Sequence, residues 1–252
     1  MLVTETDLVE HIQKISSLRL VSIYETKPWH TIRGHEITFR RRGERAETSR
    51  KKRLILERFL QFLCVCPWVR TVVLTGSLAL DNAKASDDID LMIITAPKTM
   101  FLCRLYAFLL AKILGLARSR LSEMQQDVIC VNIWIDGSDL VVPASKMSLY
   151  GAREIVNAQV IVDAHNIFDT FIVQNRWIYE KLPNWEYHPK RTEYPSTHRI
   201  GGLRTDSVQS TKSIAQRLNT LAGRLQLWYM RPHITNEIVS KTQLWFHPKI
   251  RH

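Results

Sequence analysis

The chain has 252 residues and a formal net charge of +11, with 45% hydrophobic and 23% charged residues. This composition is that of a globular protein with a sizeable core, and it excludes a fibrous or disordered chain. The positive charge favours polyanionic partners such as a nucleotide, RNA or another phosphorylated acceptor.

Cysteine usage and the N-terminal sequence indicate a reducing compartment. The four cysteines lie within apolar runs and lack CxxC spacing, so we expect free thiols and no zinc site. They are Cys64, Cys66, Cys103 and Cys130. The first residues lack the basic and apolar regions of a signal peptide, which predicts a cytoplasmic protein.

One apolar run, residues 100–114, resembles a membrane segment only superficially. It is marginal in length for a bilayer, and it contains Arg104 and Lys112, which would be costly there. We therefore expect a core helix at this position and no membrane partner.

The N-terminal part, residues 1–45, predicts a small appendage. A helix is expected over 4–18, followed by two strands at 20–24 and 35–40 with turn signals between them. A helix followed by a hairpin suggests a winged-helix-like unit.

A dense basic block begins at the end of this part. Its members are Arg40, Arg41, Arg42, Arg50, Lys51, Lys52 and Arg53. The last four open a helix predicted over 49–63, where cations oppose the helix macrodipole. A bound polyanion would favour them there, and a solvated basic surface is the alternative.

The middle part, residues 46–145, alternates between helices and strands. After the helix at 49–63 we expect strands at 70–75, 89–95 and 128–135, with a short helix after the first and a helix over 99–117 after the second. This order predicts an α/β (α+β) fold with a small mixed sheet flanked by helices.

The C-terminal part, residues 146–252, is expected to be mainly helical. Helical spacing of apolar residues occurs near 153–156, over 166–182 and over 213–230. The last helix has an apolar stripe that we expect to be core. The stripe consists of Ile214, Leu218, Leu221, Leu225 and Trp228.

The segment that joins the first two strands of the middle part contains the strongest candidates for a functional site. Gly76 and Ser77 follow one apolar strand, and Asp88 and Asp90 open the next. Alternation along a strand places both carboxylates on one side, where they suit a hard cation such as Mg²⁺ or Mn²⁺. Glycine allows close approach of an anion, and serine offers a hydroxyl and an amide to phosphate.

These motifs resemble the polymerase β-like nucleotidyltransferase superfamily, whose signature is apolar-Gly-Ser, a spacer, then Asp-apolar-Asp-apolar. Thr75 departs from the signature, because an apolar residue usually precedes the glycine. The resemblance implies that Gly76 and Ser77 touch an NTP, and that Asp88 and Asp90 hold Mg²⁺ for transfer of a nucleoside monophosphate.

The resemblance is carried by residues 50–135. The remainder is similar to a prokaryotic branch of the superfamily in three short segments, for which no substrate is implied. These segments are Cys130-Val131-Asn132, Leu218-Asn219-Thr220-Leu221-Ala222 with Leu225-Gln226, and Phe246-His247-Pro248.

The family has a third carboxylate on the strand after the next helix, and its position in this chain is open. If the two strands are parallel, as a helical crossover requires, Asp127 opens the second strand level with the aspartate pair. If they are antiparallel, Asp136 takes its place. Asn132 is a third alternative and would make the site degenerate, since an amide is a poor base. Asp87 is expected to cap the loop or to add negative field.

Two functions follow as expectations. The first is a Mg²⁺-dependent nucleotidyltransferase that acts on an unknown hydroxyl acceptor. The second is a nucleic-acid-binding or regulatory, antitoxin-like module built on a catalytically degenerate nucleotidyltransferase fold.

Overall fold

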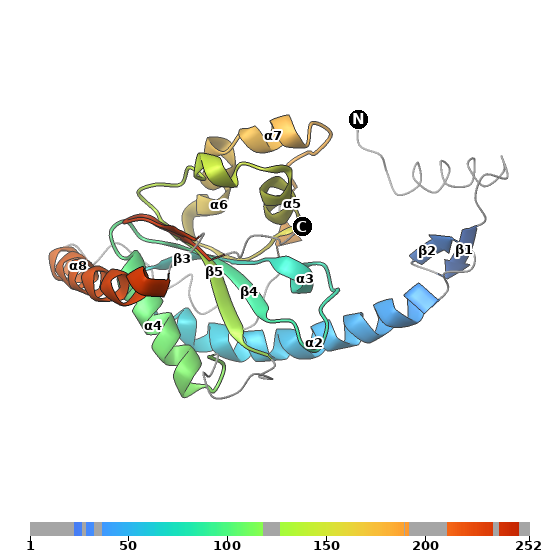
Figure 1. Ribbon diagram of the computed structural model, residues 1–252, viewed down its shortest axis with the longest axis horizontal. Coiled ribbons are helices and arrows are strands. Elements are labelled where there is room, and N and C mark those ends of the chain that lie inside the picture. The colour runs from blue at the N-terminus through green and yellow to red at the C-terminus, as the bar shows by residue number, and fades with distance from the viewer. Residues whose placement is uncertain are drawn as a thin grey trace.

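The computed structural model describes residues 23–26, 29–32, 37–117, 127–188, 190–191, 211–233 and 237–246. Within them, one seven-stranded mixed sheet has the order β7-β6-β3-β4-β5-β9-β8 (Figure 1). Its strands are β3 Val69–Leu74, β4 Ile89–Thr95, β5 Ile129–Asp136, β6 Gln159–Asp163, β7 Lys190–Arg191, β8 Ile238–Val239 and β9 Gln243–Trp245.

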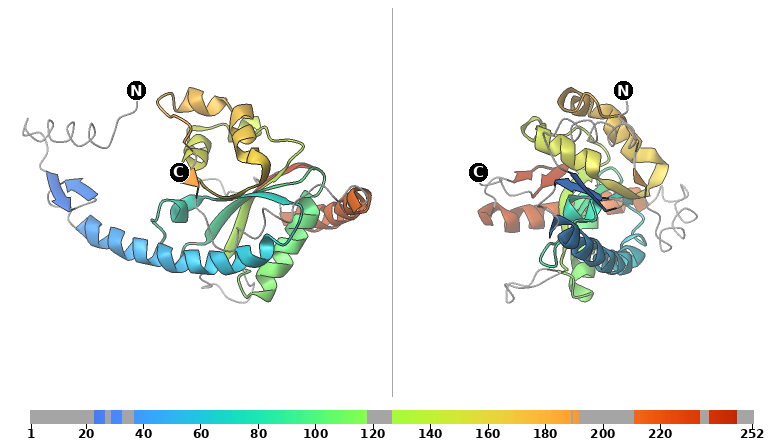
Figure 2. Two further views of the ribbon diagram at one scale, coloured as in Figure 1. Left: turned by 180° about the vertical axis from the view of Figure 1, so that it is seen from behind. Right: turned by 90° about the vertical axis from the view of Figure 1, so that its right-hand side faces the viewer.

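Helices cover both faces of the sheet, with α2 and α4 on one side and α5, α6 and α7 on the other (Figures 1 and 2). The helices are α2 Ile37–Leu63, α3 Gly76–Ala79, α4 Met100–Ile113, α5 Leu149–Asn157, α6 Ile167–Gln174, α7 Trp177–Lys181 and α8 Thr211–Met230. Single 3-10 turns lie at Ala144–Lys146, Ala164–Asn166 and Arg231–His233. The predicted α/β class with a mixed, helix-flanked sheet is confirmed.

The core consists of two clusters, one on each face of the sheet. Leu74 and Leu91 are buried with α2 and α4, whereas Val73 and Met92 are buried with α6. Alternate residues of one strand therefore serve opposite clusters, as the pleat requires. The central strands are apolar on both faces because helices cover both.

The three central strands match their predicted positions to within one residue. β3 pairs antiparallel with β4, and β4 pairs parallel with β5 across the crossover helix α4. The parallel arrangement assumed in choosing Asp127 is confirmed, and Ile89 and Ile129, the first residues of the two strands, lie side by side.

The predicted N-terminal elements differ most from the structure. The expected helix over 4–18 lies outside the described residues. The hairpin consists of β1 Ile23–Thr26 and β2 Trp29–Ile32, and helix α2 already begins at Ile37, so a strand over 35–40 is wrong. Alternating Ile37 and Phe39 resemble a strand, but ion pairs one turn apart, such as Arg40 with Glu44 at 3.0 Å, suit a helix.

The predicted division of the chain does not follow the described elements. The boundary at residue 45 falls within α2. The C-terminal part supplies four helices, as expected, and also strands β6, β7, β8 and β9 of the sheet. The central fold is therefore assembled from segments on both sides of residue 145.

The apolar stripe of α8 is not core, which corrects the prediction for this helix. Its five large side chains, from Ile214 to Trp228, are 49% to 74% exposed. Helix α8 packs on α4 through small residues, with Ala215 and Ala222 buried. A Cβ atom on Gly223 would lie 2.8 Å from Phe101 of α4. The close contact uses the small face, so the large residues point away.

Two compositional expectations concern features that the described residues contain, the thiols and the helices. All four cysteines are free thiols, with Cys64, Cys66 and Cys103 buried and Cys130 half-buried. Among the described helices, none combines the length and the apolar character needed to cross a membrane.

Candidate functional site

Asp90 lies on the sheet face that α5, α6 and α7 cover, and Asp88 directly precedes its strand. Ile89 and Leu91 are fully buried in the cluster with α2 and α4. Alternation along the strand places Asp90 on the opposite side. Both residues are half-buried. The same-side relation of the pair stays a prediction for Asp88, which directly precedes β4.

Gly76 lies directly against the carboxylate of Asp90. The amide of Thr75 donates to the carbonyl of Asp90 at 3.0 Å, which brings the end of β3 to the start of β4. Gly76 has φ +67°, and a Cβ atom there would lie 2.4 Å from Oδ2 of Asp90. Glycine is required here both by the left-handed backbone and by the close approach.

Ser77 and Asp87 fix the loop between these strands. The Ser77 hydroxyl donates to Oδ2 of Asp87 at 2.8 Å, and the amide of Lys84 donates to the same oxygen at 2.9 Å. Asp87 therefore caps the loop, which is one of its two expected roles. The same bonds hold Ser77 next to the glycine.

Asn132 takes the place beside Asp90. Its Nδ2 donates to Oδ1 of Asp90 at 2.6 Å, and its Oδ1 accepts from the Cys130 thiol at 2.9 Å. The register of β4 against β5 shifts at this point, since Leu91 pairs with Val131 and Met92 with Ile133. Asn132 is the extra residue of a bulge, a feature that redirects a side chain.

Asp127 lies on the other face, which contradicts its choice as the third carboxylate. It lies two residues before β5 with a left-handed backbone, φ +61°, and its side chain meets Lys52 of α2. Its Oδ1 accepts from Nζ of Lys52 at 2.6 Å. Lys52, only 1% exposed, also donates to the carbonyls of Ala85 and Asp87. Asp127 is therefore the partly exposed member of an ion pair whose lysine is buried.

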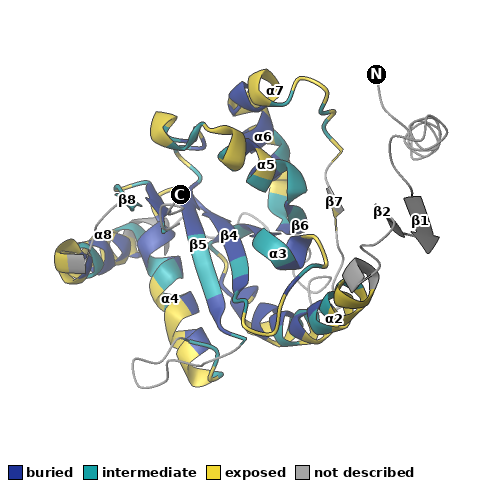
Figure 3. Cartoon of the chain, turned by 45° about the vertical axis from the view of Figure 1, so that its right-hand side comes forward, coloured by how far each residue is buried: buried dark blue, intermediate teal, exposed yellow. Residues whose placement is uncertain are grey.

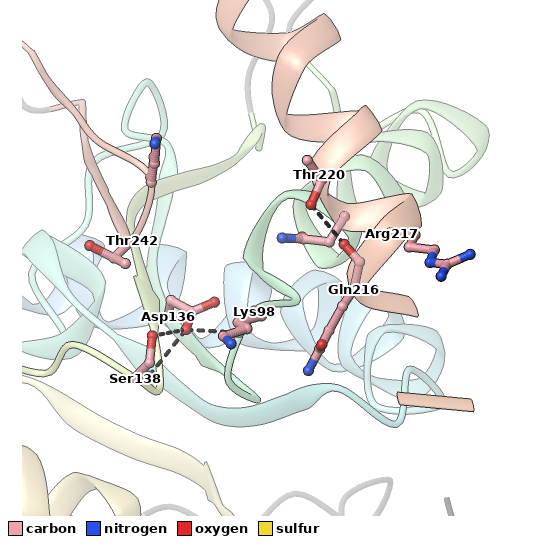
Figure 4. A pocket seen from close by; sticks show the side chains of 9 residues that line it. Lys98, Asp136, Ser138, Gln216, Arg217, Thr220 and Thr242 are labelled. Carbon is pink, nitrogen blue, oxygen red and sulfur yellow. Dashed lines mark hydrogen bonds between the residues drawn. The ribbon is translucent and has the colours of Figure 1, made fainter. Parts of the chain in front are cut away.

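Asp136 lies at the opposite end of β5, beside Thr95 rather than Asp90. It is 2% exposed and accepts from the amides of Lys98 and Thr99 and from the Ser138 hydroxyl. Figure 4 shows it in a separate polar pocket, with α8 side chains on the far side. This pocket has a volume of about 470 Å³. Asp136 thus does not belong to the Asp88–Asp90 site.

The basic block does not form one surface. Exposed members are Arg40, Arg41, Arg50 and Lys51. Within α2, Arg50 and Lys51 lie near Glu47, at 3.1 and 3.9 Å. They are in mid-helix, so the argument from cations at a helix start is wrong.

The other members of the block tie α2 to the segment after the Gly-Ser turn. Arg42 donates to the carbonyl of Leu80 at 2.7 Å, and Arg53 donates to Asp81 at 2.8 Å. Arg42 also lines a cavity of about 300 Å³ with Arg41, Arg45 and Asn82. These arginines therefore hold the segment after the Gly-Ser turn in position. The arginine-lined cavity also contains Asn82 of that segment.

Helix α5 contributes two residues that the motif search missed. Tyr150 and Glu154 lie one turn apart on α5, which contacts α3. The pKa of Tyr150 is raised, mainly by burial and then by the negative charges of Glu154 and Asp90. Tyr150 therefore belongs to the electrostatic surroundings of Asp90, and Glu154 belongs to those of Tyr150. Their separation from the motif in sequence left no local signal for this.

Thr75 adds an unusual polar group at the end of β3. It is 2% exposed, and its hydroxyl has no hydrogen-bond partner among the described residues. The residue directly before Gly76 thus carries a buried hydroxyl.

The donor set of the site is two carboxylates and one amide. Among the described residues, no group of three His, Cys, Asp or Glu side chains could hold a metal ion. Asp88 and Asp90 nevertheless supply the hard oxygen ligands that a single Mg²⁺ takes, together with water and phosphate. The chain matches no protein-family model, no curated protein sequence and no solved structure with which it was compared.

Proposed function

We propose that this chain is a Mg²⁺-dependent nucleotidyltransferase that transfers a nucleoside monophosphate from an NTP to a hydroxyl acceptor. The observation that carries the proposal is the close approach of Gly76 to Asp90, 2.4 Å from a virtual Cβ to Oδ2. It brings a phosphate-compatible turn and a metal-compatible carboxylate pair into one place, which neither motif achieves alone.

Asp88 and Asp90 would hold the cation. When bound, Mg²⁺ or Mn²⁺ supplies positive charge to the phosphates of the nucleotide. Two carboxylates suit one ion, and the amide of Asn132 replaces the carboxylate that a second ion would need. We therefore propose a site for one nucleotide-borne ion rather than two.

Gly76 and Ser77 would bind the phosphate end of the nucleotide. Because Gly76 has no Cβ atom, Oδ2 of Asp90 lies directly against it, so a cation held by Asp90 would lie next to this turn. The Ser77 hydroxyl is held beside the glycine by Asp87 at 2.8 Å. Catalysis would then rest on positioning of the NTP and on electrostatic stabilisation.

Labelled nucleotides test this proposal. We would incubate the purified chain with each α-labelled NTP, with and without Mg²⁺, and follow transfer of label to RNA, to small hydroxyl compounds and to the protein. We expect Mg²⁺-dependent label that is lost in Asp88→Asn and Asp90→Asn. Glu180→Gln, an exposed acid on α7, is the matched control and retains transfer. Full transfer by either aspartate variant would remove the mechanism.

A second candidate is a nucleic-acid-binding or regulatory module on a spent nucleotidyltransferase fold. The hydrogen bond from Asn132 to Asp90 favours it, because an amide stands beside the pair where a base is needed. This function predicts RNA binding that weakens with salt, ignores Mg²⁺ and persists in Asp88→Asn. Transfer of label that requires Asp88 would exclude it.

A further inference from the structure

Helix α8 presents a line of large apolar side chains to solvent. Ile214, Leu218, Leu221, Leu225 and Trp228 are 60%, 49%, 56%, 60% and 74% exposed, and we call this line the α8 seam. Figure 3 shows exposed positions along α8, drawn in yellow. Contiguous exposed apolar surface of this kind is rare on monomers and marks interaction sites.

The spacing of the α8 seam indicates what packs on it. Successive members are four, three, four and three residues apart, which is the two-in-seven repeat of a coiled-coil seam. A helix that lies on a membrane has a broader apolar face than this narrow line. The repeat therefore favours another helix as the occupant.

The α8 seam is held outward by contacts on the other side of α8. The amide of Leu102 donates to Oδ1 of Asn219 at 3.0 Å, and Nε2 of Gln226 donates to the carbonyl of Phe101 at 2.8 Å. Together with the close packing of Gly223 on Phe101, these bonds fix the rotation of α8 against α4. Turning the seam inward would break them, so the surface is pre-organised.

The charge beside the α8 seam indicates the chemistry of the partner. Arg217 and Arg224, seven residues apart, are exposed and each directly precedes a seam leucine. Neither forms an ion pair with a described residue. Residues 211–230 contain no Asp or Glu, so α8 of a second copy would bring no acid to these arginines. An acidic helix of a partner protein would bring carboxylates to both arginines.

We propose that the α8 seam is the docking surface for an amphipathic, acidic helix of a partner protein. Apolar side chains of that helix pack between Leu218, Leu221 and Leu225, and its flanking Asp or Glu side chains pair with Arg217 and Arg224. This surface lies on α8, which packs on α4, whereas Asp90 faces α5, so docking is separate from the proposed transfer reaction.

Binding of designed peptides to the full chain tests the proposal. The probe is a fluorescent peptide of three heptads with leucine at the two seam positions and glutamate at the flanking positions. Its partner probe carries lysine in place of glutamate. We expect the acidic peptide to bind at least about tenfold more tightly than the basic one, and increasing salt to weaken its binding.

Two sets of variants assign this binding to the α8 seam. Leu221→Lys weakens binding of the acidic peptide at least about tenfold. Val173→Lys, at a 60% exposed position on α6, leaves it unchanged. Exchange of Arg217 and Arg224 for Glu reverses the preference to the basic peptide. Circular dichroism verifies that each variant is folded, which is expected because all substituted side chains are exposed.

The other occupants give distinct results, and each overturns the proposal. A concentration-dependent dimer that Leu221→Lys abolishes identifies a second copy of the chain. Binding to vesicles of phosphatidylserine and phosphatidylcholine in equal amounts, lost in Leu221→Lys without any peptide binding, identifies a membrane surface. Equal affinity for the two peptides, or affinity for neither, would also contradict the proposal that an acidic helix docks on the α8 seam.

Discussion

At the level of single residues, Asn132 sets the charge beside Asp90. Its side chain has the shape of aspartate, and its Nδ2 lies 2.6 Å from Oδ1 of Asp90. In this position an amide donates a hydrogen bond to a carboxylate, whereas a third carboxylate would repel it and attract cations. The charge of the site, rather than its shape, is therefore the property that Asn132 changes.

Replacing Asn132 with Asp tests this point without an activity assay. In the absence of divalent ions, Asn132→Asp is expected to lose about 1–2 kcal/mol of stability, because two carboxylates then face each other. Mg²⁺ is expected to restore more stability to the variant than it adds to the original chain. Thermal unfolding with and without Mg²⁺ measures both effects. An unchanged response to Mg²⁺ would show that residue 132 does not adjoin the ion.

Substitution of Gly76 separates the effect of backbone strain from the effect of the close contact with Asp90. Gly76→Ala introduces a side chain at φ +67° and places its Cβ 2.4 Å from Asp90. Gly115→Ala has a similar φ of +71° but nothing within 4 Å of the added atom. We expect Gly115→Ala to lose about 1–2 kcal/mol from backbone strain alone, and Gly76→Ala to lose more. Urea unfolding gives both values, and equal losses would argue against a tight contact with Asp90.

The sequence is sufficient for part of the site and not for the rest. Alternation along a strand predicts that Asp88 and Asp90 share a face. It does not predict the place of Asp127, which precedes β5 with a left-handed backbone and pairs with Lys52 of α2. The bulge that directs Asn132 toward Asp90 has no local sequence signal either, since it depends on pairing with a neighbouring strand.

At the level of elements, α2 positions the loop that carries the motif. Lys52 projects from this helix to Asp127 and to the carbonyls of Ala85 and Asp87, and so joins three segments. The basic block that suggests a polyanion surface in the sequence is in part an internal support. A pattern of charge in a sequence does not distinguish these roles, because the partners of Lys52 lie far along the chain.

Substitution of Lys52 measures this support. Lys52→Met removes the cation from a site that is 1% exposed and leaves Asp127 and two carbonyls without it. We expect a loss of about 3 kcal/mol, at the lower end for a broken buried pair because Asp127 is 38% exposed. Lys51→Met is the control, since Lys51 is 71% exposed, and it should change stability by less than about 0.5 kcal/mol. Denaturant unfolding compares them, and similar small losses would contradict a structural role for Lys52.

The helices also show which features the periodicity of apolar residues predicts and which it does not. The stripe of α8 correctly predicts a helix, but periodicity does not identify what covers the stripe. The small residues Ala215, Ala222 and Gly223 decide the contact with α4, because they allow the closest approach. Similarly, alternating Ile37 and Phe39 suggest a strand, although the neighbouring residues continue a helix that extends to Leu63.

At the level of the whole molecule, the aspartate site and the α8 seam lie on different layers. The site occupies the face under α5, and α8 packs on α4, which covers the other face (Figures 1 and 3). Asp136 and its pocket lie at the far end of β5. Changes on α8 should therefore leave ligand binding at the aspartate pair intact.

Ligand-induced stabilisation provides a test of this separation across the molecule. If an NTP with Mg²⁺ binds the folded chain at Asp88 and Asp90, then a concentration of about 100 times Kd adds about 2.7 kcal/mol to the free energy of unfolding. Asp90→Asn should lose this gain, because one of two ligands for the ion is removed, whereas Leu221→Lys should retain it. Thermal unfolding with each NTP, with and without Mg²⁺, measures the gain in all three proteins. Stabilisation that persists in Asp90→Asn would place the nucleotide away from the aspartate pair. Stabilisation that disappears in Leu221→Lys would show that the aspartate site and the α8 seam are coupled.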